Sequence, residues 1–265
     1  MFRRLSRWAI ALPVALALVG MSGCGAGPSG TAAPSPSTTA QETKAQELTV
    51  FAAASLTGTF TELGKKFEAA HPGTTVKFNF GSSATLAQQI VQGAPADVFA
   101  AASPATMKTV TDASPAGAPA TFVRNKLEIA VPPDNPAKVD ELKDLADAKV
   151  KVALCAEQVP CGAAAVKALG AAGLKVTPVT LEQDVKATLT KVELGEVDAA
   201  LVYKTDVLAA KGKVTGIAFP EADKAINDYP IATLSKAGDL AKQFVDLVLS
   251  QQGKDVLTEA GFEAP

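Results

Sequence analysis

Residues 48–57 read LTVFAAASLT, and the fold is decided here because a strand passes directly into a helix. The apolar run 48–53 predicts a buried β-strand. Apolar side chains then recur at spacings of four, three and four, at Leu56, Phe60, Leu63 and Phe67. This spacing predicts a helix over about residues 55–70 that ends at His71-Pro72-Gly73, since proline and glycine interrupt helices.

The same alternation of strand and helix continues to the end of the chain, which indicates an α/β fold with mostly parallel strands. Further strands are expected at residues 76–80, 97–102, 127–131, 150–154, 176–179, 197–202, 214–219 and 231–234. Further helices are expected from near residue 83, around 142–145, at about 162–172, across 185–192, at 203–210 and around 240–248.

Both periodicities lapse in two segments, residues 114–125 and 219–230, and these are predicted crossings between two lobes. We expect one lobe to contain residues 48–122 plus 228–265 and the other to contain residues 123–227. Ligands of such folds bind in the cleft between lobes, at the carboxyl ends of the strands.

The N-terminus has the layout of a secretory signal, with three arginines before an apolar run at residues 8–19 that is too short to span a bilayer comfortably. Residues 20–24, GMSGC, resemble the lipobox of bacterial lipoproteins, in which the cysteine is lipidated. We therefore expect a signal peptide at residues 1–23 and a lipidated Cys24; the alternative is an ordinary cleaved signal followed by an unrelated cysteine. Residues 24–47 are expected to form a flexible tether, because residues 25–46 contain no Leu, Ile, Val, Phe or Met. The protein would then be anchored to the outer face of the cell membrane.

Composition narrows the function classes further. The 25 Lys and Arg residues are balanced by 27 Asp and Glu residues among 265, which argues against a nucleic-acid-binding protein of the basic-patch kind.

Apart from Cys24, the cysteines are Cys155 and Cys161, and in an oxidising compartment we expect a disulfide between them. Zinc binding is the alternative, but two thiolates and the single histidine of the chain fall short of a usual zinc site.

Hydroxyl groups follow several of the expected strands. Ser55 follows the first strand, the pair Ser82 and Ser83 follows the second, and Tyr203 follows the strand at 197–202. Each lies at or near a helix start, where unpaired N–H groups and the positive end of the helix dipole can bind an anion. The alternative is that Ser55 and Ser83 only cap their own helices, each contributing about 1 kcal/mol. Helix starts at residues 161–162 and 184–185 can add backbone donors.

Three motifs in this order and spacing resemble the molybdate-binding proteins of bacterial molybdate ABC transporters: residues 48–57, residues 80–90 (FGSSATLAQQI) and residues 93–99 (GAPADVF). The similarity continues through residues 159–162, 182–185 and 200–203 and so covers nearly everything after the tether. It implies the type II periplasmic-binding-protein fold, with two α/β lobes and a ligand cleft between them.

The resemblance also implies a binding site. The oxyanion would be bound by hydroxyls and nearby amides of Ser55 and Ser83, by the N–H groups of Cys161 and Val185, and by the Tyr203 phenol. The family commonly has alanine where this chain has Cys161, a change that a backbone donor tolerates. The adjacent Ser82 leaves the serine assignment open by one residue, and alignment with the family favours Ser83. No catalytic residue, cofactor or direct cation ligand is expected, because the metal is bound as its oxyanion.

The implied function is capture of molybdate or tungstate by an extracytoplasmic monomer that delivers it to an ABC permease. A receptor for another tetrahedral oxyanion such as sulfate is the alternative within the binding class. A secreted serine hydrolase is disfavoured, because the chain has no Gly-x-Ser-x-Gly motif and its only histidine, His71, lies in a turn at a helix end. A purely structural surface domain would not require hydroxyls at successive helix starts.

Overall fold

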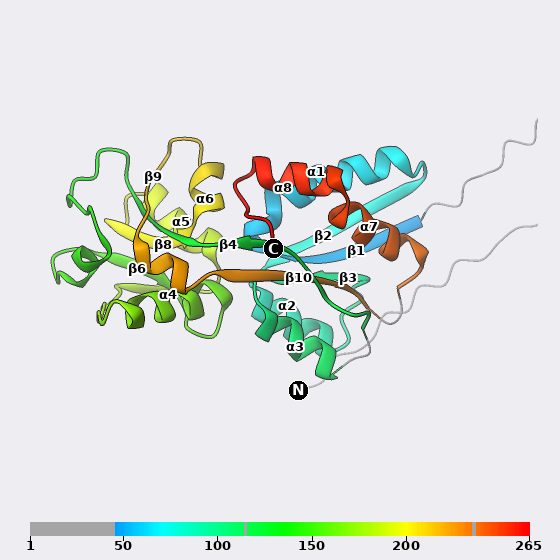
Figure 1. The fold of residues 1–265 in the computed structure, drawn as a ribbon, viewed down its shortest axis with the longest axis horizontal. Helices are drawn as coiled ribbons and strands as arrows, with labels where there is room; N and C mark the ends of the chain where they lie inside the picture. The colour runs from blue at the N-terminus through cyan, green and yellow to red at the C-terminus, as the bar shows by residue number, and fades with distance from the viewer. Residues whose placement is uncertain (1–45, 114–115, 235–236) are drawn as a thin grey trace, which may run out of the picture. The chain divides into compact units, whose positions relative to one another are not determined.

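The computed structural model describes residues 46–113, 116–234 and 237–265, and the predicted signal peptide, Cys24 and nearly all of the predicted tether lie outside these ranges. The described chain forms two five-stranded sheets within one compact unit (Figure 1). The first sheet has the strand order β2-β1-β3-β10-β4 and the second the order β7-β6-β8-β5-β9. Among the described residues, no helix has both the length and the apolar character needed to cross a bilayer.

The first sheet is built from the two ends of the described chain. Its strands are β1 (Gln46–Ala53), β2 (Thr74–Gly81), β3 (Val98–Ala100), β4 (Ala120–Asn125) and β10 (Asn227–Thr233). Its helices are η1 (Ala54–Leu56), α1 (Thr57–Ala70), α2 (Ser83–Val91), α3 (Pro104–Ala113), α7 (Asp239–Leu249) and α8 (Gln251–Glu259).

Both faces of this sheet are covered by helices (Figure 1). Successive side chains of a strand point to opposite faces, so Val50 packs in one apolar cluster and Phe51 in another. The cluster around Val50 includes Phe60 of α1, Phe244 of α7 and Leu257 of α8. The cluster around Phe51 is formed largely by α2 and α3. Burial on both faces explains the uninterrupted apolar run that marked β1 in the sequence.

The second sheet comes from the middle of the chain. Its strands are β5 (Leu127–Val131), β6 (Val152–Cys155), β7 (Thr180–Glu182), β8 (Ala199–Tyr203) and β9 (Thr215–Ile217). Its helices are η2 (Leu142–Ala146), α4 (Pro160–Ala171), α5 (Val185–Glu193), α6 (Lys204–Ala209) and η3 (Pro220–Lys224). Its core is a single buried apolar cluster.

The two sheets share one arrangement. In each, the first three strands of the order are parallel: β1 lies between β2 and β3, and β6 lies between β7 and β8. The other strands, β4, β5, β9 and β10, pair antiparallel. The sheets are therefore mixed rather than mostly parallel, since antiparallel strands carry the chain between the lobes.

The crossings lie side by side. β4 ends at Asn125 and β5 begins at Leu127, while the return crossing enters β10 at Asn227. Asn125 and Asn227 are direct partners in the antiparallel ladder, so both connections leave the first sheet at the same place. These two adjacent strands therefore form the connection between the two lobes.

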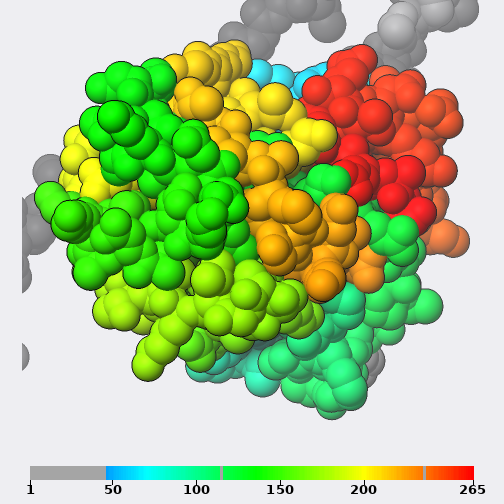
Figure 2. Space-filling model, turned by 60° about the vertical axis from the view of Figure 1, so that its left-hand side comes forward, coloured from blue at the N-terminus to red at the C-terminus, as the bar shows by residue number. Residues whose placement is uncertain are grey.

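An ion cluster lies where the crossings meet the C-terminus. Lys126 Nζ is 3.2 Å from an Asp223 carboxylate oxygen and 3.3 Å from a Glu263 carboxylate oxygen. In the space-filling view, the green segment around Lys126, the orange segment of η3 and the red C-terminus adjoin one another (Figure 2). These groups are substantially exposed, so the cluster contributes little to stability and mainly tethers the C-terminal residues to the crossing.

One local prediction was wrong, and other elements were missed. The strand expected at 176–179 is irregular, and the pairing strand is β7 at Thr180–Glu182. Helix α3 and strand β4 were not predicted, because Pro104 and the Pro/Ala-rich segment before β4 obscure both periodicities. The helix expected around 240–248 is α7, but α8 was missed; the chain leaves the helical conformation at Ser250, whose side chain caps α8.

Candidate functional site

A pocket lies between the two lobes, where the carboxyl ends of the six central parallel strands converge. The loops after β1, β2 and β3 contribute Ala53, Ala54, Ser55, Gly81, Ser82, Ser83 and Ala102. The ends of β6, β7 and β8 contribute Val159, Pro160, Cys161, Asp184, Val185 and Tyr203. All five residues of the predicted ligand set line this one pocket.

Ser55 enters the pocket from η1, the single turn between β1 and α1. It is buried, and neither η1 nor α1 has a side-chain cap. Its hydroxyl oxygen lies 2.9 Å from the phenol oxygen of Tyr229 on β10. The alternative interpretation of Ser55 as a simple helix cap is therefore wrong, and its hydroxyl is instead oriented by a buried phenol.

Ser83 is the first residue of α2, as the sequence predicted. Its hydroxyl oxygen accepts a hydrogen bond of 3.0 Å from the N–H of Ala102, in the loop after β3. A hydroxyl that accepts in this way retains its own proton for donation. The position preceding the helix belongs to Ser82, which also makes no cap hydrogen bond, so the capping alternative is wrong for Ser83 too.

Tyr203 is the last residue of β8 and is almost completely buried. Asn227 Nδ2, on β10, donates to the phenol oxygen at 2.8 Å and also to the carbonyl of Ala102 at 2.7 Å. Burial, above all, raises the pKa of Tyr203 well above its ordinary value. The phenol consequently remains protonated at neutral pH and keeps a proton to donate.

Cys161 lies in the first turn of α4, where an N–H has no partner within the helix. It forms a disulfide with Cys155, the last residue of β6. The next residue, Gly162, must be a glycine, because a Cβ would collide with the Ala156 carbonyl. The disulfide and this close contact hold the start of α4 against the end of β6.

Val185 is the first residue of α5, and its N–H is one of the unpaired donors at that helix start. Asp184 Oδ1 accepts from the N–H groups of Lys186 and Ala187, at 2.8 and 3.0 Å. Asp184 is therefore the cap of α5. Its carboxylate is thus directed at the amides after Val185, which leaves the Val185 N–H for a ligand.

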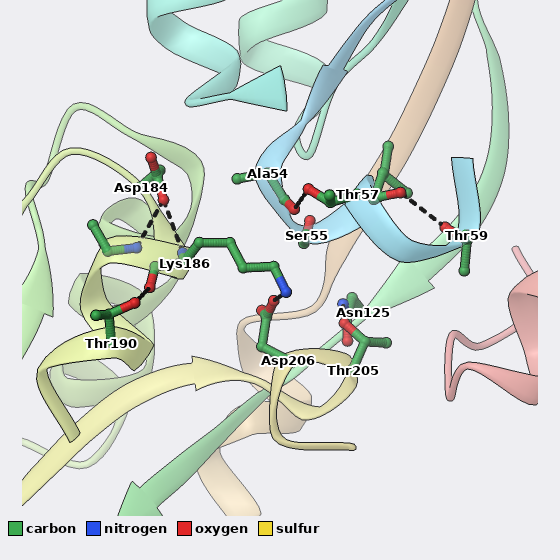
Figure 3. Close-up of polar contacts among 12 residues, drawn as sticks. Ala54, Ser55, Thr57, Thr59, Asn125, Asp184, Lys186, Thr190, Thr205 and Asp206 are labelled. Carbon is green, nitrogen blue, oxygen red and sulfur yellow. Dashed lines mark hydrogen bonds and ion pairs between the residues drawn. The ribbon is translucent and has the colours of Figure 1, made fainter. Parts of the chain in front are cut away.

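The residues around the pocket supply neutral donors. Among the described residues that line it, there is no lysine, arginine or histidine. Outside this lining, Lys186 Nζ lies 3.7 Å from a carboxylate oxygen of the buried Asp206, while the Lys186 side chain is itself 39% exposed (Figure 3). Burial raises the pKa of Asp206 to about 6, although the neighbouring Lys186 ammonium lowers it. An anion in this pocket would therefore be bound by dipoles and hydroxyls.

Sequence reasoning missed three groups that orient the site: the Ala102 amide, Asn227 and Tyr229. No motif pointed to them, because the return crossing that contains Asn227 and Tyr229 shows neither periodicity. A buried tyrosine and asparagine at a lobe crossing could have served as the signal, since buried polar groups need partners.

His71, considered and dismissed as a catalytic base, lies at the C-terminus of α1, outside the pocket lining. Its ring stacks on Phe67 and its nitrogens contact the Phe67 carbonyl and the Gln243 side chain. It is therefore a structural contact between α1 and α7.

Residues 48–263 match the bacterial extracellular solute-binding protein family, and the chain belongs to that family. The molybdate-binding protein ModA of Mycobacterium tuberculosis is 40% identical over 254 residues, which are 95% of this chain and 95% of that protein. ModA of Escherichia coli is 31% identical over 236 residues, covering 82% of this chain and 88% of that protein. The resemblance to molybdate-binding proteins that the sequence motifs indicated is confirmed.

Solved structures support the fold assignment. The periplasmic molybdate-binding protein of Azotobacter vinelandii matches with a TM-score of 0.70 at 22% identity, covering 82% of this chain and 99% of that one. The sulfate-binding protein SubI of Mycobacterium tuberculosis matches with a TM-score of 0.71 at 16% identity, covering 83% and 87%. At these identities the likeness concerns the fold alone, and the predicted two-lobed periplasmic-binding-protein fold is confirmed.

Proposed function

We propose that this protein captures molybdate, and also tungstate, outside the cytoplasm and delivers it to an ABC permease. The observation that carries the proposal is the single pocket in which Ser55, Ser83, Cys161, Val185 and Tyr203 converge. The 40% identity to a molybdate-binding protein over nearly the whole chain supports the same ligand.

In this proposal the ion receives hydrogen bonds from both lobes. Ser55 and Ser83 donate from the first lobe through hydroxyl and backbone groups. Tyr203 donates its phenol proton from the second, together with the N–H groups of Cys161 and Val185. Each hydroxyl is already oriented by a buried neighbour, so little conformational freedom is lost on binding.

Neutral donors suit an anion that carries two charges and no proton. Every hydroxyl and amide can donate, whereas a protonated phosphate would need an acceptor for its own proton. Removal of an unpaired charge from water costs several kcal/mol or more, so the donors must be in place when water leaves. Closure of the lobes about the strands β4 and β10 would bring the two halves of the donor set together, and the ion would stabilise the closed form.

The size of the ion decides between molybdate and its rivals. Sulfate has the same charge but is smaller, so donors placed for molybdate would reach it poorly. Tungstate is nearly isosteric with molybdate and is expected to bind comparably.

Calorimetric titration of the protein with molybdate, tungstate, sulfate and phosphate tests this proposal. We expect tight binding of the first two and weak binding of the others. Sulfate binding as tight as molybdate binding would reassign the protein to the sulfate receptors. No binding of any tetrahedral oxyanion would reject the proposed function.

The place of action is part of the proposal. The signal-like residues 1–23 and the lipobox-like Cys24 support an acyl anchor on the outer face of the membrane. We expect the full chain to enter the membrane fraction of a bacterial host and Cys24→Ala to shift it to the soluble fraction. Equal membrane association of both forms would argue against the anchor and leave the ligand assignment untouched.

A further inference from the structure

We infer that the hydroxyl of Ser82 is a further ligand for the bound oxyanion, in addition to the five residues of the proposed site. This inference rests on the proposed function and extends it, because the adjacent Ser83 keeps its own role. The two serines then act together at the start of α2. The sequence left open which of the two is the ligand, and in this inference both are.

The first observation is the burial of Ser82 without a partner. Only 7% of the residue is exposed, and its hydroxyl oxygen is buried with no hydrogen-bond partner in the described protein. The residue lines the oxyanion pocket. A buried hydroxyl left unpaired is costly, and native proteins rarely tolerate one away from a functional site.

The second observation is that Ser82 does not use the partner its position offers. It directly precedes α2, where a serine hydroxyl commonly accepts from an N–H of the first turn. No such hydrogen bond is made. The Ser82 hydroxyl therefore does not cap α2. The N–H groups in the first turn of α2 receive no hydrogen bond partner from it.

The other three hydroxyls of the site provide a contrast. Ser83 accepts from the Ala102 amide, Tyr203 accepts from Asn227, and Ser55 contacts the Tyr229 phenol. Of the four hydroxyls that line the pocket, only that of Ser82 neither donates nor accepts a hydrogen bond within the described protein. An oxyanion oxygen in the pocket would satisfy the donor, in a charge-assisted hydrogen bond of the stronger kind.

A matched pair of variants isolates the hydroxyl from the shape of the side chain. Threonine and valine have nearly the same shape, but only threonine retains a hydroxyl. We expect Ser82→Thr to bind sodium molybdate more tightly than Ser82→Val in calorimetric titrations of the full chain, by about tenfold or more. Ser82→Ala should also bind about tenfold more weakly than the wild type, without a loss of ligand-free melting temperature.

Ser250→Ala is the control, because Ser250 caps α8 with its hydroxyl and lies outside the pocket lining. It should lower the melting temperature and leave molybdate affinity unchanged. Equal affinities of the threonine and valine variants, or an alanine variant that binds like the wild type, would overturn the role of Ser82. Either result would leave the proposed function standing, whereas a wild-type protein that binds no oxyanion would remove both.

Discussion

The hydroxyl oxygen of Ser55 and the phenol oxygen of Tyr229 lie 2.9 Å apart, although 174 residues separate them in the chain. Ser55 follows the first strand of the described chain, and Tyr229 lies on β10, one of the two strands that cross between the lobes. The contact thus joins the proposed ligand site to the crossing between the lobes. Burial, above all, raises the pKa of Tyr229, so its phenol keeps its proton and can donate it to Ser55.

Tyr229→Phe is expected to weaken molybdate binding about tenfold, because Ser55 loses the partner that orients its hydroxyl. Calorimetry on Ser55→Ala, Tyr229→Phe and the double variant checks this. The two residues act through one hydrogen bond, so the double variant should bind little worse than Ser55→Ala alone. Strictly additive losses would show that Tyr229 affects binding by another route.

Tyr203→Phe is expected to reduce molybdate affinity by about tenfold or more, since one ion oxygen would lose its phenol donor. The fold should remain intact because the ring still fills its buried site. His71→Ala is the control: it removes a ring that joins α1 and α7, so it should lower the melting temperature and leave the affinity unchanged. A loss of affinity in the folded His71 variant would contradict the site.

Reduction of the disulfide between Cys155 and Cys161 is expected to have a small global and a larger local effect. The closed loop is short, with a sequence separation of 6, so the free energy of unfolding should fall by only about 2 kcal/mol. The Cys161 amide would be held less firmly, and molybdate affinity should decrease several-fold. Melting curves and titrations with and without a reductant measure both. An affinity unaffected by full reduction would mean that Gly162 and the α4 packing suffice to hold this amide.

The raised pKa of Asp206 predicts that the stability of the fold depends on pH. Its pKa in the fold is about 6, against an ordinary value of 3.8, because burial disfavours its charge. The folded state therefore binds the proton more tightly than the unfolded chain, and this contribution to stability is present below pH 3.8 and lost as the pH rises through 6.

The free energy of unfolding of Asp206→Asn should rise relative to that of the wild type as the pH increases. The difference between them should change by about 3 kcal/mol from pH 4 to pH 8, in favour of the variant. Chemical denaturation at several pH values measures the gap. Asp112→Asn is the control: it removes an exposed carboxylate, so it should change the free energy of unfolding by less than about 1 kcal/mol. If the difference in free energy of unfolding between Asp206→Asn and the wild type did not change with pH, the raised pKa of Asp206 would be contradicted.

Much of the fold could be predicted from local patterns. β1 and α1 follow from the apolar run before Ser55 and the helical spacing after it, and α2 begins at the predicted residue. Such signals are local, because a buried strand and an amphipathic helix each imprint their own period on the chain. Strand β4 and helix α3 lacked a clear period and were missed.

Serine and tyrosine at strand ends, the cysteine pair and the helix starts were thus all readable from the sequence alone, since each depends on neighbours only a few residues away. Only the tertiary structure decided which distant groups orient them: Tyr229 on Ser55, Ala102 on Ser83, and Asn227 on Tyr203. It also decided that the Ser82 hydroxyl is left without a partner. Hydrogen bonds between segments that far apart depend on the packing of two sheets and the pairing of β4 with β10, and this packing leaves no periodic trace in the chain.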